Sequence, residues 1–294
     1  MNPQDNKPLS SVLFLAKIPM ASASAAQFRV EDGKTYVQVA SVPELDPDIA
    51  INLVAYDFED ELPENSIAFH PIYGSVMYDA YWWSFSTKRF MNNLQAAEAN
   101  PNIIAHFIHV DSNGGEAFGC HEAFEMVRNL KKPCIALVDT MAASAGYYLA
   151  CAAGKLYAGS KFSEIGCIGT MCVMENYKEY LEKKGIKEIE YYSNYSPLKN
   201  KVFTDALEGD GKDYVKRFLD PLAFQFISDV RATRTGVAED SDAVKGEIFY
   251  ADTAEEQGLC DGIRTIEEVV AELAAAAAPK KPAEPSIDIN KIQL

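Results

Sequence analysis

The chain has 294 residues, of which 48% are hydrophobic and 24% charged, a composition typical of a globular protein that buries a sizeable core. Its formal net charge of −16 argues against binding to duplex nucleic acid, which requires many lysines and arginines, and against an anionic membrane surface. No apolar run approaches the length of a membrane span, and the run at residues 12–16 is too short for a signal-peptide core, so we expect a cytoplasmic protein.

Residues 1–65 form a mixed lead-in, or a small subdomain, before a more regular pattern begins. Alternating apolar and polar residues over 34–40 predict a strand, and three prolines interrupt the segment that follows. From residue 66 to residue 273, strand patterns alternate with helix patterns, which predicts one α/β domain with a mostly parallel sheet. The alanine-rich and proline-rich segment 274–294 is of low complexity, and we expect it to be disordered.

Within 66–273 the elements follow one another closely. The apolar run at 103–110 has the pattern of a strand buried on both faces. The predicted strands cover 67–73, ending in a turn at Gly74, then 103–110, 134–139, 188–192 and 247–250. The predicted helices cover 87–99, 116–130, 144–153, a segment around 174–181, and 215–230, where apolar residues recur on one face.

The six cysteines form no CxxC pair and no zinc-binding spacing. Most of them lie in apolar runs, so we expect buried, reduced thiols, and we predict no metal site and no cofactor.

Ser144 lies among very small residues, where the predicted strand 134–139 turns into a helix. A helix N-terminus favours negative charge on an oxygen, so this serine is a candidate nucleophile, with the N–H group of Ala145 as a donor to the oxyanion. A plain helix N-cap on a small-residue packing helix is the alternative.

The sequence Asp-Ser-Asn-Gly-Gly at 111–115 follows the buried strand 103–110 directly. Its glycines, Gly114 and Gly115, allow backbone N–H groups to point into an open site and to bind an oxyanion. An ordinary turn between a strand and a helix is the alternative.

A serine nucleophile needs a base, and all four histidines precede Ser144 in the sequence. His106 and His109 lie three residues apart on one strand and therefore on opposite faces, so we expect core histidines there. A lysine can replace histidine where burial lowers its pKa, because desolvation disfavours the ammonium form. The segment 193–201 offers Lys199 and Lys201, which could equally be solvated loop lysines.

Taken in order, Asp-Ser-Asn-Gly-Gly at 111–115 and Met-Ala-Ala-Ser-Ala-Gly-Tyr-Tyr at 141–148 resemble the signal peptide peptidase A family of Ser–Lys peptidases. That family includes the phage prohead, or capsid maturation, proteases. Further similar segments lie at 153–158, 165–169 and 246–261, so the resemblance spans about 66–270.

The resemblance implies a Clp/crotonase-like fold of stacked ββα units and a homo-oligomer. It implies Ser144 as the nucleophile and a base lysine after the strand 188–192, which best matches Lys199, with Lys201 in reserve. The missing membrane anchor makes the chain more similar to the phage subgroup. A capsid or scaffold protein is then the expected substrate, in the host cytoplasm or in a forming virion.

The chain departs from the family pattern at two motifs. The loop at 112–115 keeps the glycines of Ser-Pro-Gly-Gly but lacks the proline, and Cys167 replaces the serine of the Gly-Ser-hydrophobic-Gly motif. A thiol is a weaker hydrogen-bond partner for the base, so Ser163 or Thr170 could take that role. The alternatives are therefore an inactive scaffold or assembly protein on the same fold, or a crotonase-type acyl-CoA enzyme.

Overall fold

The structure is a computed structural model that describes residues 26–31, 34–39, 51–54, 58, 61–80 and 84–277. Most of the predicted segments 1–65 and 274–294 therefore lie outside the described residues. One sheet runs through the described part, with strands at β1 (Ala26–Glu31), β2 (Lys34–Val39), β3 (Ile51–Val54), β4 (Ser66–Val76), β5 (Ile103–Gly115), β6 (Cys134–Ala143), β7 (Lys155–Ala158), β8 (Glu164–Gly166) and β9 (Ile248–Tyr250).

The sheet is parallel at its centre and antiparallel at both edges. Its order is β1-β2-β3-β4-β5-β6-β8-β9, and β7 pairs with the first half of β6 while β8 pairs with the second half. The pairs from β3 to β8 are parallel, whereas β1, β2 and β9 join antiparallel. A mixed α/β fold with a mostly parallel sheet is thereby confirmed, while the Clp/crotonase-like assignment stays a prediction.

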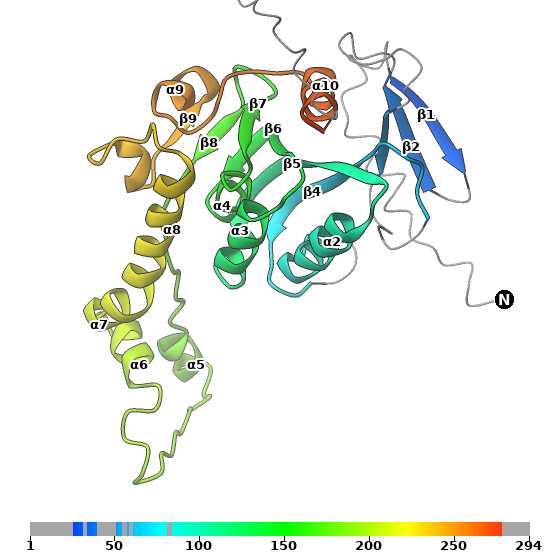
Figure 1. The fold of residues 1–294 in the computed structure, drawn as a ribbon. Coiled ribbons are helices and arrows are strands. Elements are labelled where there is room, and N and C mark those ends of the chain that lie inside the picture. The colour runs from blue at the N-terminus through cyan, green and yellow to red at the C-terminus, as the bar shows by residue number, and fades with distance from the viewer. Residues whose placement is uncertain are drawn as a thin grey trace, which may run out of the picture.

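Helices cover both faces of this sheet (Figure 1). Helices α2 (Thr87–Ala99), α3 (Cys120–Arg128) and α4 (Ala145–Ala150) pack with Ile108 and Val110 of β5 on one face. Helix α10 (Ile266–Ala277) packs with Phe107 of β5 on the other face. Strand β5 is thus buried on both faces, as its continuous apolar run predicts.

The remaining helical segments follow β8 and complete the chain. They are α5 (Lys178–Lys183), α6 (Lys201–Leu207), α7 (Lys212–Tyr214), a π-helical turn at Val215–Leu219, α8 (Asp220–Thr233), a 3₁₀ turn at Asp242–Lys245 and α9 (Ala251–Glu256). In Figure 1, α5, α6 and α7 project away from the sheet on a long extension, and α8 leads back to it. We call residues 169–219 the arm.

Several predicted boundaries are wrong. Strand β4 does not end in a turn at Gly74 but continues to Val76, paired with the glycines of β5. Residues 188–192 form no strand and belong to the arm. Helix α3 begins at Cys120 instead of residue 116, and α4 ends at Ala150, before the predicted end at residue 153.

The predicted domain limits also differ from the continuous sheet. Strand β3 lies before residue 65, yet it is buried and pairs with β4, so the sheet crosses the expected boundary. Helix α10 includes residues 274–277, with Ala274 buried, so the beginning of the segment expected to be disordered is helical.

Candidate active site

Ser144 lies at the sharp turn between β6 and α4. Its backbone has φ 51° and ψ −124°, a combination that is costly for any residue with a side chain. The six residues of α4 are all buried, and this packing holds the turn in place. A strained serine between a strand and a helix has the geometry of a nucleophile elbow, which presents the hydroxyl at the end of the sheet.

Two glycines allow the neighbouring segments to approach this turn. A Cβ on Gly114, whose φ is +97°, would lie 2.7 Å from the Cβ of Ser144. A Cβ on Gly146 would lie 2.9 Å from the Cβ of Ser112. The small residues around Ser144 therefore bring the end of β5 into direct contact with the start of α4.

The segment 111–115 is part of β5 and not a free turn. Ser112 is buried, and its hydroxyl donates to the carbonyl of Gly74 at 2.6 Å and accepts from the N–H of Gly114 at 3.1 Å. An oxyanion at Gly114 would have to share that N–H group with Ser112. The N–H of Ala145 opens α4, where no carbonyl four residues earlier in the helix is available to it.

The segment after β8 lies against the other side of Ser144. The N–H of Ser144 donates to the carbonyl of Gly166 at 3.0 Å, and the next residue, Cys167, has φ 55° and donates from its N–H to Glu247 at 2.7 Å. The motif at 166–169 therefore borders Ser144.

The two residues offered as substitutes for Cys167 are engaged elsewhere. Ser163 is buried, and its hydroxyl donates to the carbonyl of Asp139 at 2.7 Å. The hydroxyl of Thr170 donates to the carbonyl of Leu219 at 3.0 Å, which joins the two ends of the arm.

Neither candidate lysine lies beside Ser144 in this chain. Within the part of the chain that the structure describes, no hydrogen bond or ion pair joins Ser144 to Lys199 or Lys201. Lys199 is exposed on the connection between α5 and α6, which forms the far end of the arm in Figure 1. Lys201 is exposed too, and its ion pair with Asp205 at 2.8 Å raises its pKa, the opposite of what a base requires.

The arm carries no buried residue. From residue 169 to residue 225 every side chain is partly or fully exposed, including the tyrosines at 177, 180, 191 and 195. Phe203, Tyr214 and Phe218 contact one another, with ring centroids 5.3 to 5.6 Å apart, yet Phe203 and Phe218 remain 45% and 39% exposed. The apolar face predicted for residues 215–230 is real, but only Phe226 and Val230 of it are buried.

Comparison with known protein families identifies the family to which this chain belongs. The sequence profile of peptidase family S49 matches residues 127–280, just over half of the chain. The chain belongs to peptidase family S49. The matched region contains Ser144, the 166–169 motif and the whole arm.

Relatives of this S49 chain include phage proteins and bacterial proteases. It is 27% identical over 186 residues to the head-tail preconnector protein GP5 of Enterobacteria phage P21, covering 62% of the chain and 36% of that protein. It is 27% identical over 209 residues to capsid assembly protease C of Escherichia phage lambda, covering 67% and 46%. It is 29% identical over 180 residues to the probable protease SohB of Buchnera aphidicola subsp. Schlechtendalia chinensis, covering 60% and 56%. The matched region thus spans only 36% to 56% of the length of these three relatives.

Three of the four histidines of the S49 chain are core residues. His106 and His109 lie on opposite faces of β5, as predicted. His106 bonds to His70 at 3.0 Å and to Glu98 at 2.9 Å, while His109 bonds to the Tyr73 hydroxyl at 2.6 Å. Burial lowers the pKa of all three, so each is neutral and held by partners.

The cysteines and the acidic side chains form neither a disulfide nor a metal site among the described residues. All six cysteines are free, but Cys172 is exposed, so the expectation of burial is wrong there. Among the described residues, no three side chains of histidine, cysteine, aspartate or glutamate gather as metal ligands. No helix in the described ranges has both the length and the apolar character of a membrane span.

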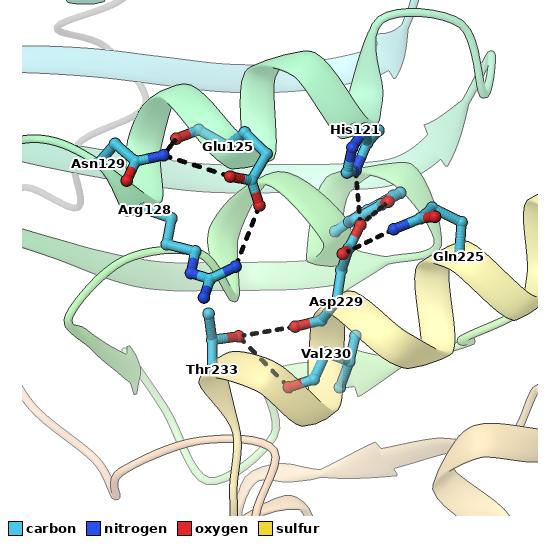
Figure 2. A network of polar contacts seen from close by, with 9 residues as sticks. His121, Glu125, Arg128, Asn129, Gln225, Asp229, Val230 and Thr233 are labelled. Carbon is cyan, nitrogen blue, oxygen red and sulfur yellow. Dashed lines mark hydrogen bonds and ion pairs between the residues drawn. The ribbon is translucent and has the colours of Figure 1, made fainter.

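Sequence reasoning missed two polar clusters next to α4. Arg234 is buried and donates to the carbonyls of Cys151 and Ala153, just beyond the helix, while pairing with Asp261 at 2.8 Å. Asp229 binds His121 (Figure 2), and it also accepts a hydrogen bond from the Tyr148 hydroxyl. These partners lie 27 to 108 residues apart in sequence, so no local pattern could reveal them.

Proposed function

We propose that the chain is a serine endopeptidase in which Ser144 is the nucleophile and Lys199 the general base. The observation that carries the proposal is the strained turn at Ser144, packed between the glycine segment of β5 and the segment after β8 in a chain of a peptidase family. The cost of that backbone conformation suits a hydroxyl that must be presented, whereas a simple N-cap would have no need of it.

In this mechanism the Oγ of Ser144 attacks the peptide carbonyl while the neutral amine of Lys199 accepts the hydroxyl proton. The N–H groups of Ala145 and of the Gly114–Gly115 segment donate to the tetrahedral oxyanion. Each such donor contributes on the order of 3 kcal/mol to the stability of the transition state. The lysine then gives its proton to the leaving amine, and water hydrolyses the acyl-enzyme.

A neutral lysine at physiological pH requires burial, and the single chain leaves Lys199 exposed. We infer that a second copy of the chain covers the arm and completes the site in a homo-oligomer. The arm carries nine basic and nine acidic residues, so the net charge of −16 comes from the rest of the chain. A neutral arm can therefore approach an acidic neighbour without net repulsion.

The relatives suggest the substrate class. One of them is named a capsid assembly protease, and another is a phage head-tail preconnector protein. We propose that this chain cleaves capsid or scaffold proteins of a phage during head assembly, in the cytoplasm of the host or in the forming virion.

The test is labelling of the full chain with a fluorophosphonate probe, together with cleavage of denatured casein. Ser144→Ala should abolish both, and Lys199→Ala should reduce both by at least about a hundredfold. Lys201→Ala should leave both nearly unchanged. Cleavage that survives Ser144→Ala contradicts the nucleophile, and loss with Lys201→Ala alone assigns the base to Lys201. A folded wild-type chain that neither labels nor cleaves would instead favour an assembly protein.

A further inference from the structure

Asp229 of α8 is a buried carboxylate that binds side chains from two other helices (Figure 2). One oxygen, Oδ2, accepts from the Tyr148 hydroxyl of α4 and from the Nδ1 of His121 of α3, the latter at 2.8 Å. The other oxygen, Oδ1, accepts from Gln225, one turn earlier on α8, at 2.9 Å. The side chain of Asp229 is only 8% exposed, so the three donors replace the water that the carboxylate has lost.

The three helices joined at Asp229 belong to different parts of the proposed site. Helix α4 begins at the nucleophile, and the N–H of Tyr148 donates to the carbonyl of Ser144 at 2.9 Å. Helix α3 follows the glycine segment at the end of β5. Helix α8 continues directly from the arm, which carries Lys199.

Apolar packing alone already holds α8 against α4. The ring of Phe226 stacks on the ring of Tyr148, with centroids 4.2 Å apart and an angle of 17°, and Val230 is fully buried. Such contacts tolerate sliding and rotation of a helix, because they have no directional requirement. The two directed donors from α3 and α4, His121 and Tyr148, fix one rotation of α8 and one position along its axis, at the cost of desolvating the Asp229 charge.

Burial and the hydrogen bond to Asp229 also raise the pKa of Tyr148, so its phenol stays protonated and able to donate to the carboxylate at neutral pH.

We propose that Asp229 is a positioning residue: through Tyr148 and His121 it fixes the direction in which α8 and the arm leave the nucleophile helix. This inference rests on the proposed function, since its purpose is to bring the arm lysine into register with a serine. A displacement of about 1 Å between reacting groups can lower the rate about a hundredfold. A fixed contact where the arm joins α8 should therefore increase the rate of reaction at Ser144.

The test compares Asp229→Asn, which keeps the shape but removes the charge, with Glu125→Gln. Glu125 lies on α3 too, but among the described residues its carboxylate bonds only to Arg128 and Asn129 at the end of the same helix, and not to the groups around Asp229 (Figure 2). For each full-length variant, the fluorophosphonate probe gives the maximal labelling rate of Ser144, the probe concentration for half-maximal rate, and the final fraction of labelled molecules.

Asp229→Asn should lower the maximal labelling rate at least about tenfold, with the half-maximal concentration and the final labelled fraction unchanged. Tyr148→Phe, which keeps the stack on Phe226, should act in the same direction, and the double variant should be no slower than Asp229→Asn alone. If Asp229→Asn fails to fold, the single variant Tyr148→Phe still decides, because it can be measured by itself against Glu125→Gln and the wild type.

Equal maximal rates for Asp229→Asn and Glu125→Gln would overturn the inference. So would a loss of labelling that appears only as a smaller labelled fraction, since that result shows unfolding and not mispositioning. Labelling that persists in Ser144→Ala contradicts the proposed function itself, so the two failures can be told apart.

Discussion

Gly114 and Ser144 are in such close contact that a single added methyl group could not fit between them. A Cβ on residue 114 would lie 2.7 Å from the Ser144 Cβ and 2.9 Å from the carbonyl oxygen of Ala143. Gly114→Ala should therefore push the end of β5 away from Ser144, the proposed nucleophile, and lower probe labelling and casein cleavage by at least about a hundredfold.

Asp242→Ala is the control for that substitution. Asp242 lies outside the arm and forms only an exposed ion pair with Lys245 among the described residues, so activity should be unchanged. Circular dichroism should show both variants folded. Wild-type rates for Gly114→Ala would mean that this segment does not contribute to the site.

Arg234 should contribute more to stability than any surface cation. It is 5% exposed, it donates to two carbonyls beyond α4 and it pairs with Asp261. Arg234→Ala leaves these acceptors without their donor and should lower the free energy of unfolding by about 3–5 kcal/mol, measured by chemical denaturation. Lys155 pairs with the same carboxylate at 3.7 Å but is 51% exposed, so Lys155→Ala should cost less than about 1 kcal/mol.

His109 should make the protein sensitive to acid. Burial lowers its pKa from the usual 6.5 to about 4, so between pH 6.5 and pH 4 the unfolded chain binds the proton and the folded chain does not. Its contribution is complete above pH 6.5 and is lost as the pH falls toward 4, a loss of about 3 kcal/mol.

The replacement His109→Gln removes this group from the titration. Denaturation curves at pH 7.5 and pH 4 should show a fall in unfolding free energy that is smaller by about 3 kcal/mol in the variant than in the wild type. Ser144→Ala serves as the control and should keep the wild-type fall. An identical fall in His109→Gln would show that this imidazole is protonated in the folded protein.

The aromatic cluster of the arm should control assembly. Phe203 packs on Tyr214 and Phe218 but is 45% exposed, so Phe203→Asp places a charge in a surface that we infer to be covered by a second copy. Sedimentation velocity should show an assembly for the wild type and monomers for the variant, with casein cleavage lost in parallel. Asp242→Ala, which breaks an exposed ion pair outside the arm, should change neither. A monomeric and active wild type would contradict the assembly.

Local sequence patterns predict an element correctly where capping residues mark its ends and its apolar face packs within the chain. Helix α2 matches its predicted limits exactly as Thr87–Ala99, because the Ser86 side chain accepts from the Arg89 N–H at the start and Asn100 ends the helix. The strand at β5 was predicted from its buried run, but its continuation through Gly114 and Gly115 was not, since paired glycines are also typical of turns.

Neither the structure of the arm nor the contacts of Asp229 could be predicted from local sequence patterns, for different reasons. The tyrosine-rich segment 188–192 has strand-like composition, but none of the strands that the structure describes pairs with it. Asp229 looks like any polar residue on a helix, and its role depends on His121 and Tyr148, which lie 108 and 81 residues away. Among the described residues of the single chain, nothing buries Lys199, so its proposed role depends on a second copy.

An arm with no buried residue makes hydrolysis depend on concentration. On the proposed function, Lys199 is exposed to solvent in a dilute chain and Ser144 lacks its base, and association of two copies completes the active site. The initial rate should then rise more steeply than in proportion to the amount of enzyme at low concentration, and become proportional once assembly is complete. A protease with this property is inactive at low concentration and becomes active where many copies are confined in a small volume.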